Sequence, residues 1–320
     1  MVEAALLALR AAASRCGAVL ETREAPAGDG AARRLGEPLP GETRRLASGW
    51  ADAVLKGPVG ETAGEVVVPL RRLLGAYANL RPARTLPGTR PLAEMDILIV
   101  RENLEDVYAG VEWSVPGAAF AVKVVTEAES RRVARLAARL AEARRRRVTI
   151  VHKANVLRAA DGLFRDAARD EIARTAPGVE VDELYVDAAT IALARRPGSL
   201  DVLLTMNQYG DILSDLAAEL AGGIGLAPSA NLGDEKALFE PVHGAAWDIA
   251  GKGAANPTAM ILSAAWMLRW LGYPGAAAAV ERAVEETLAR GEATRDLGGS
   301  LSTLEYGRRV AGRVACPPRG

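Results

Sequence analysis

Short runs of apolar residues alternate along this chain with longer stretches in which apolar positions recur at helical spacing. The short runs predict buried strands and the longer stretches predict helices. Strands are predicted at residues 18–20, 53–55, 96–100, 148–151, 183–186 and 201–205. Helices are predicted at residues 3–13, 67–78, 130–145, 162–175, 211–220, 257–271 and 275–290. This alternation favours an α/β fold built on a largely parallel sheet.

Length, charge and cysteine usage exclude some classes of function. The 320 residues are enough for two domains or for one large α/β unit. The net charge of zero gives no basis for binding nucleic acid or an acidic membrane surface, and no secretory or membrane-spanning segment is predicted. Cys16 and Cys316 lie near opposite ends without metal-ligand spacing. Two free thiols, either buried or idle, in a reducing cytoplasm are therefore expected.

Two aspartates, Asp211 and Asp215, open a predicted helix and share one of its faces because they are four residues apart. A divalent cation such as Mg²⁺ or Mn²⁺ would offset their repulsion more than the helix dipole does. Taken alone, an exposed acidic first turn is the commoner explanation. The helix, however, follows the apolar run 201–205, and Lys153 and Asp187 end two other apolar runs. Because ligands of open α/β sheets bind at the carboxyl ends of strands, the pattern predicts a metal-centred active site.

One glycine-rich segment, residues 28–30 (Gly-Asp-Gly), looks like part of a phosphate-binding loop. It follows no convincing strand and precedes a polar, irregular stretch. A fragment of such a motif is weak evidence, so a surface loop is expected there. No complete G-x-G-x-x-G sequence opens a strand–helix unit, which argues against a Rossmann fold.

Five motifs, in order along the chain, are similar to those of one known family. They are residues 78–84 (Ala-Asn-Leu-Arg-Pro-Ala-Arg), 99–110 (Ile-Val-Arg-Glu-Asn-Leu-Glu-Asp-Val-Tyr-Ala-Gly), 151–156 (Val-His-Lys-Ala-Asn-Val), 210–215 (Gly-Asp-Ile-Leu-Ser-Asp), and 238–244 (Leu-Phe-Glu-Pro-Val-His-Gly) with 248–253 (Asp-Ile-Ala-Gly-Lys-Gly). The chain resembles the isocitrate/3-isopropylmalate dehydrogenase family, the β-decarboxylating dehydrogenases, from about residue 2 to about residue 309.

The resemblance implies a three-layer α/β fold, distinct from the Rossmann fold, with a large parallel or mixed sheet between helices. It implies a large cofactor-binding domain at residues 1–76 and 223–320, and a small dimerisation, metal and substrate domain at residues 77–222. Family members open with a strand ending in Gly-Asp-Gly-Ile-Gly-Pro-Glu, followed by the helix that begins here at Val2. That strand is absent from the sequence, and a gene start placed too far downstream is the expected explanation.

The resemblance also implies a reaction, in which a 2-hydroxy acid is oxidised to a 2-oxo acid that loses CO₂ through an enolate. Mg²⁺ or Mn²⁺ would act as the Lewis acid. Lys153 would serve in removing the hydroxyl proton, and Tyr108 in protonating C3 after decarboxylation. The implied metal ligands are Asp187, Asp211 and Asp215, and the arginines that match the family's clamp for substrate carboxylates are Arg71, Arg81 and Arg101.

Partner and cofactor follow from the same resemblance. In this family the metal site is shared, so Asp187 and Lys153 are expected to act on the partner's substrate in a homodimer. An acid at Asp248, near the ribose, would bind the 2′-hydroxyl and repel the 2′-phosphate of NADP, which favours NAD. The implied cofactor contacts are Glu240, His243, Gly244, Asp248 and Asn256.

The substrate is expected to be distinguished at one helix start, where isocitrate enzymes place Ser and Asn. Here Val67 and Val68 stand at that position and favour an apolar substituent, so 3-isopropylmalate, an intermediate of leucine biosynthesis, is the expected substrate. Isocitrate or homoisocitrate stays an alternative, because residues 101–110 look more like the isocitrate version. A non-catalytic subunit of the same family is the second alternative, although such paralogues usually lose catalytic residues that are present here.

Overall fold

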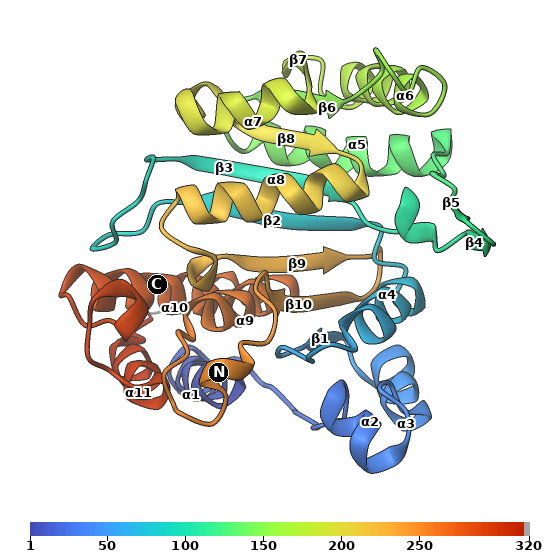
Figure 1. Cartoon of the computed structure of the whole chain (residues 1–320). Coiled ribbons are helices and arrows are strands. Elements are labelled where there is room, and N and C mark those ends of the chain that lie inside the picture. The colour runs from blue at the N-terminus through green and yellow to red at the C-terminus, as the bar shows by residue number, and fades with distance from the viewer. Residues whose placement is uncertain (317–320) are drawn as a thin grey trace.

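The computed structural model describes residues 1–316 as a sheet with helices on both faces (Figure 1). Within these residues the main sheet has eight strands in the order β1-β10-β9-β2-β3-β8-β6-β7, and β4 and β5 form a separate two-stranded ribbon. The strands are β1 Ala53–Leu55, β2 Ala78–Arg84, β3 Asp96–Glu102, β4 Glu112–Val115, β5 Ala118–Ala121, β6 Arg147–His152, β7 Glu180–Tyr185, β8 Val202–Thr205, β9 Pro228–Leu232 and β10 Ala237–Pro241. The predicted three-layer α/β class is confirmed.

The main sheet is mixed, whereas apolar periodicity alone favours a largely parallel one. Strands β3, β8, β6 and β7 run parallel to one another. Strand β2 is antiparallel to both of its neighbours, β3 and β9, and β9 is antiparallel to β10. One predicted strand, at residues 18–20, is wrong: the segment is irregular, and Val19 is 83% exposed.

Strands β2, β9 and β10 are absent from the sequence-based prediction, and β2 begins where a helix over residues 67–78 is wrongly predicted to end. Buried polar side chains lie in all three of these strands. The Nδ2 of Asn79 donates to Ser229 Oγ at 2.7 Å and to Asn231 Oδ1 at 3.0 Å. Polar groups that satisfy one another can be buried, but they interrupt the apolar pattern by which a strand is recognised.

Helices cover the two faces of the sheet unequally. Helices α7 and α8 pack on one face, against Ile97 and Ile99 of β3. The other face, which carries Leu98 and Val100, is covered by α5, α6, α9 and α10, with α1 and α11 outside α9 and α10 (Figure 1). The helices are α1 Val2–Cys16, α2 Asp29–Leu35, α3 Gly41–Arg45, α4 Ala63–Leu73, α5 Glu127–Glu142, α6 Ala160–Thr175, α7 Val186–Arg195, α8 Asn207–Leu220, α9 Thr258–Trp270, α10 Pro274–Ala289 and α11 Thr303–Arg313.

Short turns of helix complete the structure: η1 Leu46–Trp50, η2 Val107–Ala109, η3 Pro197–Ser199, η4 Ile224–Leu226, η5 Trp247–Ile249 and η6 Arg295–Leu297. Among the residues described, no helix has the length and apolar character needed to cross a membrane. The division into residues 1–76 with 223–320 and residues 77–222 stays a prediction, since β2 pairs with β9 across that boundary within one sheet.

Residues 28–30 do not form the expected surface loop, because Asp29 is the first residue of α2. The Asp29 carboxylate accepts hydrogen bonds from the Thr62 amide at 3.0 Å and the Thr62 hydroxyl at 2.8 Å. Gly60, at a φ of 96°, passes so close that a Cβ there would lie 2.2 Å from the same carboxylate. These hydrogen bonds fix the loop that precedes α4 to Asp29. Helix α4 carries the first of the predicted substrate-binding residues.

The two ends of the described chain are joined by a disulfide between Cys16 and Cys316, whose Cα atoms are 5.5 Å apart. The prediction of two free thiols is wrong. Helices α1 and α11 pack side by side and bring together residues separated by 300 positions, a relationship that no local pattern reveals (Figure 1). Arg15 strengthens this contact by donating to the carbonyls of Ala311 at 2.9 Å and Val314 at 2.8 Å.

Candidate active site

Two of the predicted metal ligands and two of the predicted substrate arginines form one cluster. Asp211 and Asp215 project from α8, while Arg81 and Arg101 come from β2 and β3. The Arg81 guanidinium lies 3.0 Å from Asp211 Oδ1 and 3.2 Å from Asp215 Oδ1, and Arg101 forms an ion pair with Asp211. Both arginines are buried, whereas Asp215 is 55% exposed. The cluster therefore has a buried cationic side and an open acidic side.

Helix α8 begins four residues earlier than predicted, at Asn207. Asp211 consequently lies in the second turn, beyond the free N–H groups of the helix start. Arginine side chains, and not the N–H groups of the helix start, therefore neutralise the charge of Asp211. The Asn207 amide oxygen accepts from Arg101 Nε at 2.9 Å, and a Cβ on Gly210 would lie 2.6 Å from Arg101 Cγ. The glycine in this motif thus makes room for Arg101 against the helix.

The predicted proton donor joins this cluster. Tyr108, in the short helix η2, donates from its hydroxyl to Asp211 Oδ2 at 2.6 Å. The Arg101 guanidinium lies 5.1 Å from the centre of the Tyr108 ring. Arg72 of α4 donates to the carbonyl of Tyr108 at 3.0 Å. The tyrosine is therefore held at both its backbone and its hydroxyl.

Burial and charge shift the pKa values of the cluster. Burial and the neighbouring guanidinium groups of Arg81 and Arg71 lower the pKa of Arg101 to about 9, which leaves it charged at neutral pH. Burial would raise the pKa of Asp211, but the attraction of Arg101 and Arg81 outweighs it and the pKa is lowered. Burial and the hydrogen bond to Asp211 raise the pKa of Tyr108. The resting state is an ionised aspartate beside a protonated tyrosine.

Arg71 is buried beside the cluster. It is 5% exposed, its guanidinium is 3.4 Å from Glu240 Oε1, and its Nε has no hydrogen-bond partner among the described residues. The side chain of Lys56 is 9% exposed, and its Nζ lies 2.9 Å from Glu240 Oε2. Val67 and Val68 are half-buried one turn before Arg71 on α4. An unsatisfied guanidinium edge close to two valines suits a ligand with both a carboxylate and an apolar group.

Sequence reasoning missed Lys56. The only local signal is a lysine placed directly after the apolar run of β1, at the end of a strand. Its burial depends on Glu240. That residue lies 185 positions beyond the last residue of β1. Burial would raise the pKa of Glu240, but Lys56 and Arg71 lower it to about 2. Glu240 therefore stays ionised and fixes both cations.

Lys153, the predicted proton acceptor, and Asp187, the third predicted metal ligand, lie together but apart from this cluster. Lys153 follows β6 and Asp187 is in the first turn of α7, and Lys153 Nζ is 2.5 Å from Asp187 Oδ1. That hydrogen bond lowers the pKa of Asp187. Among residues 1–316 no three acidic, histidine or cysteine side chains converge in a way that could hold a metal. A single chain therefore presents the predicted metal ligands as two separate halves.

The predicted cofactor residues lie on β10 and the segment that follows it. Glu240 uses its oxygens on Lys56, Arg71 and Asn231, the last at 2.9 Å. His243 is half-buried and Gly244 and Asp248 are exposed. Asn256 is buried, where it donates to Asp296 at 2.9 Å and accepts from the Thr258 amide at 2.9 Å. These residues form one continuous stretch leading from the buried cations to the start of α9.

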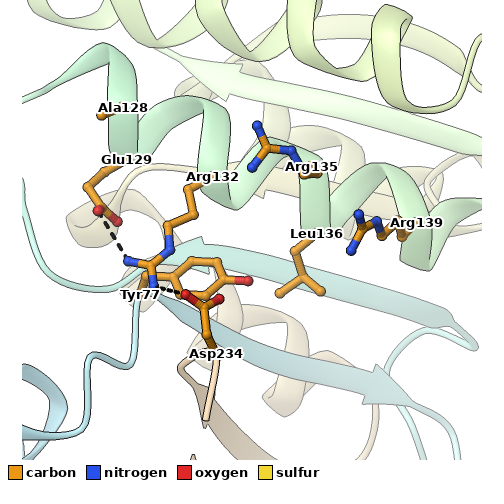
Figure 2. Close-up of a pocket in the computed structure, with 8 residues that line it drawn as sticks. All are labelled: Tyr77, Ala128, Glu129, Arg132, Arg135, Leu136, Arg139 and Asp234. Carbon is orange, nitrogen blue, oxygen red and sulfur yellow. Dashed lines mark hydrogen bonds and ion pairs between the residues drawn. The ribbon is translucent and has the colours of Figure 1, made fainter. Parts of the chain in front are cut away.

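A separate groove of about 420 Å³ lies along α5, on the face of the sheet opposite α8 (Figure 2). It contains three arginines, but their charges are largely matched. Arg132 pairs with Glu129 at 3.3 Å and with Asp234 at 2.7 Å, and it lies 3.9 Å from the ring of Tyr77. Arg135 pairs with buried Glu171. None of the predicted site residues lines this groove, so it is a surface ion-pair network away from the chemistry.

The fold is a mixed α/β sheet, and its cluster sets two buried arginines beside two aspartates and a tyrosine. The chain belongs to the family described as isocitrate/isopropylmalate dehydrogenase, whose model matches residues 1–310. It is 51% identical over 287 residues to the 3-isopropylmalate dehydrogenase of Archaeoglobus fulgidus. The aligned region covers 89% of this chain and 87% of that protein. It is also 51% identical over 244 residues to the isocitrate/homoisocitrate dehydrogenase of Thermus thermophilus, covering 75% and 72% of the two chains.

A solved structure shows the same architecture. The isocitrate dehydrogenase from Methylococcus capsulatus superposes with a TM-score of 0.91 at 41% sequence identity, covering 98% of this chain and 95% of that one. The family resemblance stated from the motifs is confirmed, as is the expectation that the chain is a dehydrogenase of this family.

Proposed function

We propose that this protein is an NAD-dependent, divalent-metal-dependent dehydrogenase that oxidises and decarboxylates 3-isopropylmalate. The observation that supports this most is the hydrogen bond from Tyr108 to Asp211, set among Arg81 and Arg101. That group combines a proton donor, an acidic metal ligand and fixed cations for carboxylates in one place. The 51% identity to an archaeal enzyme of that name supports the substrate.

The donor set fits a hard divalent cation. Asp211 and Asp215 offer carboxylate oxygens on one face of α8, and the acidic side of the cluster is open. Asp187 of a partner chain would supply the third carboxylate. When bound, Mg²⁺ or Mn²⁺ supplies Lewis-acid chemistry at the substrate oxygens. Arg81 and Arg101 then have the substrate's carboxylates as partners in place of the two aspartates.

Two further residues, Lys153 and Tyr108, each carry out one of the proton transfers. Lys153 would take up the proton of the substrate hydroxyl on C2, the carbon whose hydride NAD would accept when bound. Tyr108 donates its phenolic proton to C3 once CO₂ has left, and its raised pKa keeps that proton available until then. Arg71, with its free Nε edge, holds a carboxylate of the substrate. Asp248, exposed on η5, is available to the ribose of NAD.

A homodimer is the assembly that we propose, because two apolar surfaces lack cover in one chain. All residues of the β4–β5 ribbon are exposed, including Trp113 at 52% and Phe120 at 46%. Isolated two-stranded ribbons are marginally stable in water. Ile191 of α7 and Ile212 of α8 are 60% and 59% exposed. Pairing of these surfaces on a twofold axis would bring Asp187 and Lys153 to the partner's Asp211 side.

The second candidate, oxidation of isocitrate or homoisocitrate, is favoured by one observation. Lys56 is a buried cation beside Arg71 that a third carboxylate could approach. Glu240 already neutralises it, however, and a carboxylate packed on Val67 and Val68 would lose hydration without a free cation. The substrate with an isopropyl group suits this pocket better.

The test is to compare NAD reduction with 3-isopropylmalate, isocitrate and homoisocitrate in the presence of Mg²⁺ or Mn²⁺. We expect the highest kcat/KM for 3-isopropylmalate. A higher value for either tricarboxylate would overturn the substrate assignment while leaving the residue roles intact. No turnover of any of the three would support the non-catalytic subunit instead.

A further inference from the structure

Lys123 lies at the centre of a buried polar cluster that none of the roles above uses. It follows the β4–β5 ribbon, and its side chain is 15% exposed. Its Nζ is 2.9 Å from Asp161 Oδ1, 3.8 Å from Asp106 Oδ1 and 4.4 Å from the centre of the Tyr209 ring. The two carboxylates are 0% and 1% exposed. Lys123 is thus the cation that compensates two fully buried acids.

On one side of this cluster, Asp161 binds the backbone of the segment that contains Lys153. Asp161 is in the first turn of α6, and its Oδ2 accepts a hydrogen bond from the backbone amide of Lys153 at 2.7 Å. Its Oδ1 has no hydrogen-bond partner among the described residues, so the charge of Lys123 is what stabilises that oxygen. One carboxylate therefore connects Lys123 to the main chain of the proposed proton acceptor.

On the other side, Asp106 binds the backbone of the segment that contains Tyr108. Asp106 has a φ of 67°, uncommon for a residue with a side chain, and its Oδ1 accepts from the Val107 amide at 2.8 Å. Its Oδ2 accepts from the Gln208 amide at 2.9 Å, at the start of α8. Its amide also donates to the Val124 carbonyl at 2.8 Å, next to Lys123. Asp106 therefore joins the tyrosine loop, helix α8 and the Lys123 segment.

Electrostatics favour a permanently charged Lys123. Burial alone would lower its pKa, but the ion pair with Asp161 and the charge of Asp106 outweigh burial and raise it. Removing the lysine charge would leave two buried carboxylates without a counterion, and both hold backbone amides next to catalytic side chains. Such acids relax by moving toward water or by taking up a proton, and either response shifts those amides.

We propose that Lys123 is a positioning residue that sets the placement of Tyr108 and Lys153 together, through Asp106 and Asp161. The inference rests on the proposed function, in which Tyr108 acts in the active site of its own chain and Lys153 in that of the partner. Lys123 then links the two active sites of the dimer, because one side chain sets a proton donor in one site and a proton acceptor in the other.

The test uses heterodimers with a single working site. In a dimer of a Lys153→Met chain with an Asp211→Asn chain, both lesions fall in one composite site and the other site is intact. That intact site takes Tyr108 from the Lys153→Met chain and Lys153 from the Asp211→Asn chain. Lys123→Met is then added to either chain in turn. We expect a fall in kcat of about 10- to 100-fold from each placement, with KM for 3-isopropylmalate within about threefold.

The two placements should affect different steps. On the chain that supplies Tyr108, the substitution should slow the protonation of C3 that follows loss of CO₂ and leave the pre-steady-state burst of NADH intact. On the chain that supplies Lys153, it should slow the burst itself. An effect from one placement only, or from neither, would overturn the proposal. Absence of activity in the heterodimer before Lys123 is changed would instead overturn the composite site, so the two failures are distinguishable.

Two further variants separate positioning from general stability. Lys123→Arg keeps the charge and should restore kcat to within about threefold of wild type, whereas equal loss in Arg and Met variants would contradict the proposal. Lys236→Met removes another half-buried lysine, one that bonds the Ala51 carbonyl, and should leave kcat unchanged. If Lys123→Met does not fold, Asp161→Asn keeps an acceptor for the Lys153 amide, and it should slow the burst alone.

Discussion

The hydroxyl of Tyr108 donates a 2.6 Å hydrogen bond to Asp211, a residue 103 positions away in the chain. The donor comes from a short helix after β3 and the acceptor from the second turn of α8. This contact places a protonated phenol against a carboxylate that is itself neutralised by two arginines. It places the proposed proton donor directly beside one predicted metal ligand.

Changing Tyr108 to phenylalanine should slow the later half of the reaction. The ring packing under Arg101 is kept, while the proton for C3 is lost. We expect a fall of about 100-fold in steady-state kcat, with an undiminished burst of NADH in stopped-flow measurement. Wild-type turnover at saturating substrate would show that Tyr108 is not the donor.

Metal binding should depend on Asp211. By linkage, Mn²⁺ at about 100 times its Kd should stabilise the wild-type protein by about 2.7 kcal/mol, seen as a rise in Tm. Asp211→Asn should abolish both that rise and turnover. Asp234→Asn, at an exposed carboxylate in the α5 groove, is the matched control and should keep both. A Mn²⁺-dependent rise in Tm that survives Asp211→Asn would place the metal elsewhere.

Glu240 should make stability depend on pH in the acid range. Its pKa is lowered from 4.5 to about 2, a shift that corresponds to about 3 kcal/mol of stability. Because the folded pKa is the lower one, this stability is fully present above about pH 4.5 and is lost as the pH falls toward about 2. Urea unfolding of the wild type and of Glu240→Gln should differ by about 3 kcal/mol at pH 7.

That difference should shrink steadily as the pH is lowered below about 4.5, because the wild-type carboxyl becomes neutral like the amide. A difference that stays constant over this range would mean that Glu240 acts through packing rather than through its charge on Lys56 and Arg71.

The two valines of α4 should control substrate preference. Replacing both Val67 and Val68 by alanine removes apolar contact worth about 1.5 kcal/mol or more, which lowers kcat/KM for 3-isopropylmalate by about tenfold. Malate, which lacks the isopropyl group, is the control substrate, and its kcat/KM should change by less than about threefold. Equal losses on both substrates would indicate a general distortion of α4.

The terminal disulfide should contribute to thermal stability. It closes a loop of 300 residues, and in the chain-entropy view such a crosslink contributes about 5 kcal/mol. Cys16→Ser should lower Tm by roughly 10 °C in non-reducing buffer, and dithiothreitol should bring the wild type down to the same value. A Tm of the wild type that does not respond to reductant would show that the bond does not form in solution.

Local patterns in the sequence predict most of the proposed catalytic residues. Apolar runs followed by Lys153, Asp187 and Asp211 place these residues at the carboxyl ends of strands, and β6, β7 and β8 do run parallel so that their ends share one edge. The same reasoning failed for β2, whose buried Asn79 and Arg81 interrupt the apolar pattern. Periodicity records which positions face a core only where that core is apolar.

What the sequence determined by itself is therefore the local part: the strand-end residues, most helices, and the family that its motifs match. Tertiary structure alone decided which distant residues meet. Glu240 joins Lys56 to Arg71, Lys123 joins Asp106 to Asp161, and Cys16 meets Cys316. Each of these contacts joins different segments of the chain. The two ionic contacts depend on burial, because a buried charge is costly unless a partner of opposite charge meets it there.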